Sequence, residues 1–298
     1  HVRYVRRDGM IVVVGDIAVD IVSTLRTPLA RGSDARAEVR VMPGGSGANV
    51  AVWLARLGHP VAFLGRVGAD LFGRWLADDL RAEGVEPHLI VDHDRATAVI
   101  QVLVEPGGER TMLPDRGANA WWQESEIPED LIAAASLLHV VGYVLLESES
   151  ARGACQAMAY ARAHAVPVSL DPSSHAPLAL LGAGGFWSRT GGVDILLPNR
   201  HEAQTLTGLA DPEAAAVALQ EHARLVAVKL DRDGCLAVQG QQRWRVPAAP
   251  VQVVNSTGAG DAFNAAFLAA WVATGDVEQA CRAGVRLGTQ AALLPGTR

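Results

Sequence analysis

The sequence predicts an α/β protein with one main domain and a small β-sheet lid. Short apolar runs, many of them rich in Val and Ile, alternate with segments whose apolar residues recur at helical spacing. Polar residues suited to ligand binding follow several of these runs, which is where an open parallel sheet places its site. A hairpin-like pattern over residues 97–114 interrupts the alternation and indicates an insertion.

Composition excludes several classes of protein. A formal net charge of -6 over 298 residues argues against a nucleic-acid partner and against an anionic membrane surface. Charged residues, Gly or Pro interrupt every apolar run well before the roughly 18 residues that a membrane span requires. The three cysteines lie far apart without a CxxC pair, which predicts a reduced, cytoplasmic protein without disulfides or a thiolate metal site.

The first regular element is expected at Met10. Residues 1–9 are basic but lack the apolar core of a signal peptide, so we expect them to be disordered or added by cloning, with a single domain over 10–298. The β-branched run Met10–Val14 predicts a buried parallel strand. No G-x-G-x-x-G pattern follows it, which argues against a dinucleotide-binding protein.

Residues 17–42 form the first of two predicted lid insertions. Asp20 is expected just past the carboxyl end of the first strand, either as a ligand-binding residue or as an ordinary turn Asp. Residues 23–38 are polar, and the chain turns extended again over 39–42.

A Gly-rich turn over Pro43–Asn49 opens the next predicted helix. Gly44 and Gly45 lack a Cβ, so the backbone can approach a ligand closely there. Asn49 lies in the first helical turn and offers both a donor and an acceptor. Such a turn suits a polyol better than a phosphate.

The alternation continues and is then broken by the second lid insertion, residues 97–117. The elements predicted before and within it are a strand over 61–64, a helix over 71–82, and extended segments over 97–104 and 110–113. The turn Pro106–Glu109 joins the two extended segments into a β-hairpin. Together with residues 36–42, this hairpin is expected to form a small sheet that covers a substrate.

The second half of the chain repeats strand and helix. The predicted strands are 137–141, 167–170, 193–197 and 225–229, followed by a meander over 235–238 and 243–246. Polar residues follow several strands and are expected to gather at the carboxyl edge of the sheet. They are Asp20, Asp171, Asn199 and Asp261.

The stretch 251–274 predicts a strand, a Gly-rich turn and a helix. The strand is expected over Val251–Val254 and the helix over 262–274. The first backbone N–H groups of such a helix are unpaired and its dipole favours an anion. Asp261 would repel that anion unless it takes a proton from the group that attacks it, which points to phosphoryl transfer with Asp261 as the base. The alternative is an acidic residue that only stabilises a helix start.

Three motifs in order resemble those of the ribokinase-like (PfkB-type) carbohydrate kinases. They are Gly44–Asn49, Asn199-x-x-Glu202 and Thr257–Phe263, and the similarity runs from about Met10 to the end of the chain. The resemblance implies a three-layer α/β/α fold with a mainly parallel sheet and a small β lid. It also implies transfer of the γ-phosphoryl group of ATP to a hydroxyl group of a small sugar, with Mg2+ as cofactor.

The resemblance assigns roles to individual residues. Asp261 matches the catalytic base, and the N–H groups of Gly258, Ala259 and Gly260 match the anion hole. The residues that match the substrate site are Asp20, Gly44, Gly45 and Asn49. Those that match the nucleotide site are Asn199, Lys229, Gly234, Thr257, Gly258 and Gly260. Asn199 and Glu202 match the Mg2+ site, although their spacing also fits an ordinary capping box at a helix start.

Departures from the family pattern affect the expected cofactors. Asn255 stands where the family usually has Asp at a monovalent-cation site, so we expect weak or no dependence on K+. Lys229 replaces a frequent Thr, and Asp231 replaces a common Gly. The lid of such proteins often pairs with its twin, so a homodimer through the lid is also expected.

Other functions of the same fold stay open. A nucleoside kinase needs an apolar or aromatic slot for a base, which Tyr143, Trp121 or Trp122 can supply. A sugar-phosphate kinase needs a cationic clamp, for which the lid offers Arg26, Arg31, Arg36, Arg110 and Arg116. The alternative from another class is a non-catalytic regulator that binds a sugar or a nucleotide. Asp261 argues against it, because a protein that only binds its ligand gains nothing from a carboxylate that faces a phosphate.

Overall fold

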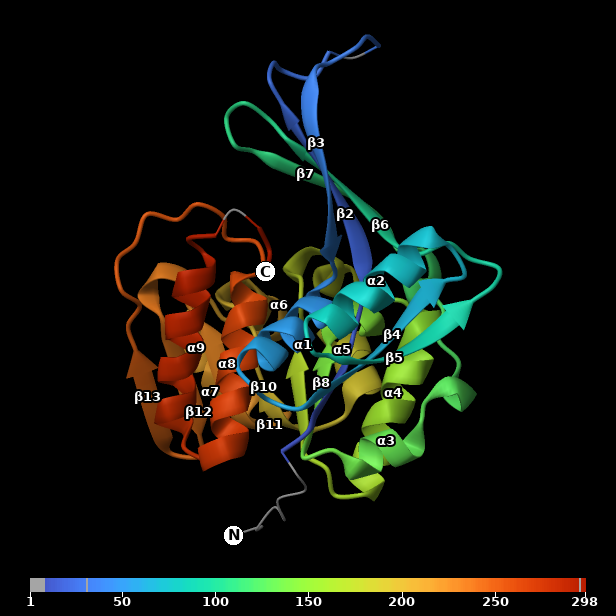
Figure 1. Ribbon diagram of the computed structural model, residues 1–298. Helices are drawn as coiled ribbons and strands as arrows, with labels where there is room; N and C mark the ends of the chain where they lie inside the picture. The colour runs from blue at the N-terminus through green and yellow to red at the C-terminus, as the bar shows by residue number, and fades with distance from the viewer. Residues whose placement is uncertain (1–8, 31, 295) are drawn as a thin grey trace.

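The computed structural model describes residues 9–30, 32–294 and 296–298 (Figure 1). Residues 1–8 lie outside the described part of the chain, and so does the expectation that this amino-terminal segment is disordered or added by cloning. In the described part of the chain no helix combines the length and the apolar character needed to cross a membrane.

A nine-stranded sheet forms the centre of the molecule. From one edge to the other the strands are β13 (Gln242–Val246), β12 (Cys235–Gln239), β11 (Ala223–Lys229), β10 (Val193–Leu196), β9 (Val168–Asp171), β8 (Leu137–Val141), β1 (Ile11–Val14), β4 (Val61–Gly68) and β5 (Glu86–Asp92). Pairing is parallel from β11 to β5, and β12 and β13 add an antiparallel meander at one edge. The carboxyl ends of the parallel strands therefore all lie on the same side of the sheet, which we call its carboxyl edge.

Helices cover both faces of this sheet, and the central strand β1 shows why. Its residues are all fully buried, and successive side chains point to opposite faces. Ile11 and Val13 join one apolar cluster, whereas Val12 and Val14 join the other. The first cluster contains α1 (Ser46–Arg56), α2 (Leu71–Ala82), α8 (Ala259–Thr274) and α9 (Val277–Ala291), and the second contains α3 (Glu129–Ala134), α4 (Ser148–Ala163), α5 (His175–Thr190), α6 (Arg200–Thr207) and α7 (Pro212–Leu219).

A separate four-stranded sheet projects from the carboxyl edge of the main sheet (Figure 1). Its strands, in spatial order, are β3 (Ala37–Gly44), β2 (Ala18–Leu25), β6 (Val99–Val104) and β7 (Arg110–Asp115). It joins the segment after β1 to the hairpin β6–β7, and we call it the lid. The predicted fold class, a three-layer α/β/α protein with a small β lid, is confirmed.

Two local predictions are wrong, and one strand was missed. Val251–Val254 is not a strand: its valines are about half exposed, and Val251 and Val253 line the cleft instead of pairing with the sheet. The helix after it begins at Ala259 rather than residue 262. Strand β5 was not expected, since Pro87 and its acidic ends mask its apolar residues.

The position predicted for Asp20 is also wrong. The chain leaves the main sheet at Val14 and enters lid strand β2 at Ala18, so Asp20 lies within the lid rather than at the carboxyl end of β1. Asp16 occupies the position at the end of β1 instead.

Candidate active site

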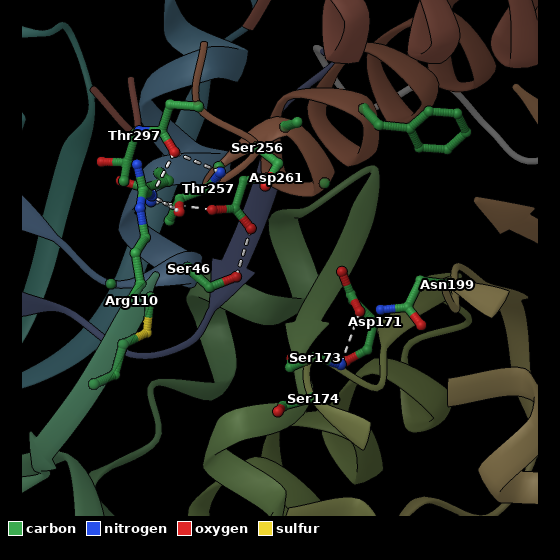
Figure 2. Close-up of a pocket in the computed structure, with 18 of the residues that line it drawn as sticks. Ser46, Arg110, Asp171, Ser173, Ser174, Asn199, Ser256, Thr257, Asp261 and Thr297 are labelled. Carbon is green, nitrogen blue, oxygen red and sulfur yellow. Dashed lines mark hydrogen bonds between the residues drawn. The ribbon is translucent and has the colours of Figure 1, made fainter. Parts of the chain in front are cut away.

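A cleft of about 1760 Å3 lies between the lid and the carboxyl edge of the main sheet. Alternate residues of each lid strand line it, as the two-residue period of a strand requires. The floor comes from the ends of β9, β10 and β11, and one wall comes from the loop before α8 (Figure 2). The sequence-predicted site residues that line this cleft are Asp20, Gly45, Asn49, Asn199, Glu202, Lys229, Gly234, Thr257, Gly258, Ala259, Gly260 and Asp261.

Asp261 lies in the first turn of α8 and faces the start of α1. Its Oδ1 accepts a hydrogen bond from Ser46 Oγ at 2.6 Å, and its Oδ2 accepts one from Asn49 Nδ2 at 3.0 Å (Figure 2). Burial raises the pKa of Asp261 to about 7, although these two hydrogen bonds oppose the rise. A carboxyl group that titrates near neutral pH is suited to accept a proton from a substrate hydroxyl.

The loop before α8 lines the cleft with an uncapped helix start. Gly258 is the N-cap residue, with a left-handed φ of 83°, and no side chain caps the helix. A Cβ at Gly258 would overlap the carbonyl oxygen of Thr297, so only glycine fits. The N–H group of Ala259 donates to Ser256 O at 3.3 Å, and this bond competes with anion binding by that group. Because the unpaired N–H groups of an uncapped helix start favour an anion, we call residues 257–260 the anion loop.

The side of the cleft next to α1 joins the lid to the Gly-rich turn. The backbone of Gly44 packs directly on the Asp20 carboxylate, which a Cβ there would displace. Gly45 has a φ of 94°, and a Cβ on it would lie 2.6 Å from Ile17 Cα. Burial, followed by the charge of Asp16, raises the pKa of Asp20 to about 6. Gly44 therefore allows the turn to pass close to the Asp20 carboxylate, and Gly45 allows it to pass close to the backbone of Ile17.

Asn49 holds an unused acceptor at this position. The residue is 4% exposed, and its Oδ1 has no hydrogen-bond partner among the described residues. Because an unpaired buried acceptor costs free energy, a hydroxyl group of a ligand would satisfy it.

Two residues of this region were missed from the sequence. Asp16 accepts hydrogen bonds from the N–H groups of Ser46 and Gly47, both at 3.2 Å, and so fixes the Gly-rich turn. Asn119 donates to Ile17 O at 2.8 Å and anchors the entry to the lid. Asp16 could have been found, since it directly follows an apolar strand.

Asn199 and Glu202 form a complete capping box at the start of α6. Glu202 N donates to Asn199 Oδ1 at 2.9 Å, and Asn199 N donates to Glu202 Oε2 at 2.8 Å. Asn199 Nδ2 also donates to Glu202 Oε1 at 2.6 Å. Burial, with the charge of Asp171 next in importance, raises the pKa of Glu202 to about 7. The pair thus satisfies the capping alternative, and both side chains also line the cleft.

Lys229 and Gly234 lie at the end of β11 and in the turn that follows. Lys229 Nζ donates to Asp171 Oδ2 at 2.9 Å. Gly234 has a φ of 90°, and a side chain there would overlap the carbonyl group of Val246. Gly234 therefore keeps this turn tight beside the cleft.

An arginine of the lid reaches the loop before α8. Arg110 Nη1 donates to Asn255 Oδ1 and to Thr257 Oγ1, each at 2.6 Å (Figure 2). Asn255 Oδ1 also accepts from the N–H group of Thr257 at 2.9 Å. These bonds join two segments about half the chain apart and place a cation beside the anion loop.

The other arginines considered for a clamp are placed differently. Arg116 lines the cleft, but it pairs with Glu147 at 3.3 Å and donates to Tyr143 O at 2.9 Å. Arg26 and Arg36 do not line the cleft, and Arg31 lies outside the described residues.

The arrangement fits a nucleotide and a hydroxyl-bearing acceptor. The anion loop, Lys229 and Arg110 supply donors for phosphates, and Asp20 with Asn49 supplies acceptors for hydroxyl groups. For Mg2+ the residues offer oxygen ligands, which it prefers. However, no cluster of three or more His, Cys, Asp or Glu side chains forms a metal site within the described ranges.

Comparison with known proteins gives consistent matches over the whole chain. A family model described as pfkB family carbohydrate kinase matches residues 8–298. Fructokinase-1 of Oryza sativa subsp. japonica is 34% identical over 275 residues, which make up 88% of this chain and 83% of that protein.

Solved structures agree in fold. Adenosine kinase from Sinorhizobium meliloti aligns with a TM-score of 0.83 and 25% identity, covering 98% of this chain and 96% of that one. Arabidopsis thaliana ribokinase complexed with ribose and ATP aligns with a TM-score of 0.81 and 25% identity, covering 97% of this chain and 94% of that one.

Proposed function

The chain belongs to the pfkB family of carbohydrate kinases, and on this premise we propose that it transfers the γ-phosphoryl group of ATP to a hydroxyl group of a small sugar. The resemblance seen in the sequence is confirmed. The chain is a phosphotransferase with an alcohol acceptor, of the class that includes relatives named fructokinase and ribokinase. The observation that carries the finer proposal is Asp261, a carboxyl group with a pKa near 7 placed at an uncapped helix start.

In the proposed reaction Asp261 accepts the proton of the acceptor hydroxyl. The hydroxyl oxygen forms a bond to the γ-phosphorus, and the bond from that phosphorus to the β-phosphate oxygen breaks to release ADP. The N–H groups of Gly258 and Gly260 stabilise the charge on the transferring oxygens. Ser46 and Asn49 hold the Asp261 carboxylate in place through their hydrogen bonds.

We assign Mg2+ to the side of the cleft that holds Asn199 and Glu202. Mg2+ retains several waters and takes further ligands from nucleotide phosphates, so few protein ligands are needed. Both Glu202 oxygens accept hydrogen bonds from Asn199, which supports contact through the water shell of the ion. When bound, the ion would neutralise phosphate charge.

The acceptor is proposed to be an uncharged sugar. Asp16, Asp20 and Asp261 place three carboxyl groups on this side, and they disfavour an acceptor that already carries a phosphate. The nucleoside alternative has support from Tyr143 and the apolar inner face of the lid, which line the same cleft.

An assay of ADP release with Mg-ATP tests the function. The acceptor panel contains ribose, fructose, 2-keto-3-deoxygluconate, fructose-6-phosphate, adenosine, cytidine and pseudouridine. Turnover of an unphosphorylated sugar is expected. A preference for a nucleoside or for fructose-6-phosphate would overturn the choice of acceptor, and ATP binding without any turnover would favour a regulator.

Replacing Asp20 with Ala should weaken acceptor binding and leave the nucleotide unaffected. Loss of hydrogen bonds to a charged group corresponds to about 1.5–3 kcal/mol, or roughly a 10- to 150-fold rise in the acceptor KM. The KM for ATP, measured in the same assay, should change little. An equal rise in both constants would contradict the placement of Asp20 at the acceptor.

Exchanging Na+ for K+ should change the rate little. Asn255 carries no charge, and its Oδ1 already accepts hydrogen bonds from Arg110 and from the N–H group of Thr257. Initial rates at equal ionic strength in the two salts measure this, with Asn255→Asp as the variant that restores a carboxylate. A several-fold faster rate in K+ would refute the expectation.

We also propose that the lid pairs with a second copy of the chain. Val39, Val41 and Leu113 are about half exposed, and they lie on β3 and β7, the two edge strands of the lid. Unpaired strand edges with apolar side chains favour pairing. Light scattering should give a dimer mass that Val41→Glu reduces to a monomer mass, and a monomeric wild type would contradict the proposal.

A further inference from the structure

Arg110 lies at the tip of the lid, as the first residue of β7 after the turn of the β6–β7 hairpin. The N–H group of Glu105 donates to Glu109 O at 2.9 Å and closes this turn. At the other end of the hairpin Val99 pairs with Asp115, next to the base of the lid. Because the turn is the end of the hairpin farthest from the base, a small rotation of the lid moves Arg110 more than it moves the residues near the base.

The Arg110 side chain contacts two acceptors in front of α8. Nη1 donates to Asn255 Oδ1 and to Thr257 Oγ1, each at 2.6 Å (Figure 2). A guanidinium Nη1 carries two protons, so each bond uses one of them. Asn255 Oδ1 also accepts from the N–H group of Thr257 at 2.9 Å. The guanidinium thus binds the residues at which the chain enters the anion loop.

The other polar side chains of the lid strands do not share this contact. Within the described ranges, Arg40 donates to Glu38 on its own strand, and Gln101 donates to Ser23 Oγ inside the lid. Neither pair reaches the loop before α8. The lid strands therefore hold this loop through the side-chain hydrogen bonds of Arg110.

The segment before the anion loop is otherwise attached on the side of α9. The N–H groups of Val254 and Asn255 donate to Ala292 O at 2.9 and 3.2 Å. Residues 247–253 belong to no helix or strand. Main-chain bonds therefore fix one side of the segment, whereas the lid fixes the other.

The chemistry of the contact suits a bond that forms and breaks as the lid moves. Both acceptors are neutral, so Arg110 leaves no buried carboxylate without a partner when it moves away. Arg110 is also exposed to solvent. Its contribution is therefore expected at the lower end of the range for hydrogen bonds to charged groups, or about tenfold in an equilibrium constant.

We propose that Arg110 couples closure of the lid to the shape of the anion loop, so that acceptor and nucleotide each tighten the binding of the other. The inference rests on the proposed kinase function. An acceptor held under the lid favours the lid position in which Arg110 contacts Asn255 and Thr257, and these contacts keep the donors of the anion loop aligned on the phosphates. By linkage, a bound nucleotide favours the same lid position and tightens the acceptor. Arg110 is then a positioning residue, because it acts through the loop.

Amide hydrogen exchange tests this link without any turnover. The N–H groups of Asn255, Thr257 and Ala259 are hydrogen bonded, so their exchange reports opening of the loop. In the protein without ligands, Arg110→Met should speed exchange over residues 254–260 by about tenfold, as expected for a lost hydrogen bond to a charged group. Unchanged exchange in this segment would overturn the inference.

Arg40→Met is the matched control for the loss of a lid cation. Arg40 also lines the cleft from a lid strand, but its ion pair with Glu38 stays within the lid. Exchange over residues 254–260 should therefore match the wild type in this variant. Equal acceleration in Arg40→Met and Arg110→Met would assign the effect to lost charge and overturn the role of the Arg110 contacts.

Calorimetry measures the coupling itself. The Kd of AMP-PNP, an ATP analogue whose γ-phosphoryl group is not transferred, is measured with Mg2+ in the absence of sugar and then with saturating D-fructose or D-ribose. In the wild type the sugar that binds should lower this Kd by about 5- to 150-fold, the usual range for coupled sites. Arg110→Met should bring the factor close to one, whereas Arg110→Lys, which keeps a donor and the charge, should retain part of it.

The outcomes distinguish the inference from the proposed function. A factor of one in the wild type, or an unchanged factor in Arg110→Met, would overturn the coupling. If neither sugar binds, the proposed acceptor class fails, and the exchange measurement still decides whether Arg110 holds the loop.

A double-mutant cycle separates action through the loop from direct contact with the nucleotide. Thr257→Val removes the hydroxyl group that accepts from Arg110 and keeps a side chain of similar volume. If Arg110 acts through Thr257, the variant that combines Arg110→Met with Thr257→Val should lose less coupling than the two single variants together. Fully additive losses would overturn the positioning role.

Discussion

Replacing Asp261 with Asn should lower kcat by about 10²- to 10⁴-fold, the range that general base catalysis contributes. The amide is close in size to the carboxyl group but cannot accept the hydroxyl proton. Its oxygen can still accept the hydrogen bond from Ser46, and Asn49 can turn its unused Oδ1 toward the new amide. Substrate binding should therefore change much less than the rate, which steady-state kinetics with the accepted sugar will measure.

Unfolding measurements separate this effect from loss of the fold. The pKa of Asp261 is about 7 in the folded chain against 3.8 in the unfolded chain, so its ionised form disfavours folding. That cost grows as pH rises from about 4 and is complete above about 7. Asn removes the cost, so at pH 8 the free energy of unfolding of the variant should be no lower than that of the wild type. If the variant is inactive and also markedly unstable at pH 8, its inactivity reflects loss of the fold and does not support Asp261 as the base.

The pH dependence of kcat provides a second check on the base. With a pKa of about 7, the rate should fall as pH decreases below neutrality because Asp261 takes up a proton. Ser46 lowers that pKa through its hydrogen bond, so Ser46→Ala should move the acid limb to higher pH. An acid limb that does not move in this variant would assign the titration to another group.

Local features of the fold could be predicted because local sequence determines them. The helix Leu71–Ala82 has the expected bounds, since Asp70 caps it and its apolar residues keep one period. The hairpin β6–β7 follows from its Pro and Gly turn. By contrast, Val251–Val254 carries the same apolar signal as a strand but lines the cleft, and composition alone does not separate these two uses of apolar residues.

The relations within the site could be predicted only in part. Motifs around Asn49 and Asp261 indicated chemistry, and the structure brings those two side chains within hydrogen-bond distance although 212 residues separate them. The sequence around Arg110 does not indicate its contacts with Asn255 and Thr257, because these contacts depend on how the lid is placed over the main sheet. The hydrogen bond from Lys229 on β11 to Asp171 on β9 likewise depends on the order of the strands in the sheet. Contacts of this kind follow from the topology of the whole fold, and no single segment of the sequence determines that topology.

The anion loop should be as sensitive as the base to substitution. Gly258→Ala should lower kcat/KM for ATP by at least about 10²-fold, the loss that follows removal of donors from an oxyanion-type site. The added Cβ would overlap the Thr297 carbonyl oxygen at a φ of 83°, so the loop must shift and its N–H groups lose their alignment.

Gly275→Ala is the matched control at the other end of the same helix. Gly275 has a φ of 69°, and a Cβ there would meet nothing within 4 Å. Both variants place Ala in the left-handed region, which costs about 1–2 kcal/mol of stability, but only Gly258→Ala also disturbs the site. Thermal unfolding should therefore show a loss in both proteins, while nucleotide affinity and turnover fall in one. If Gly275→Ala is as inactive as Gly258→Ala, the loss reflects helix stability, and the anion loop has no special part in phosphoryl transfer.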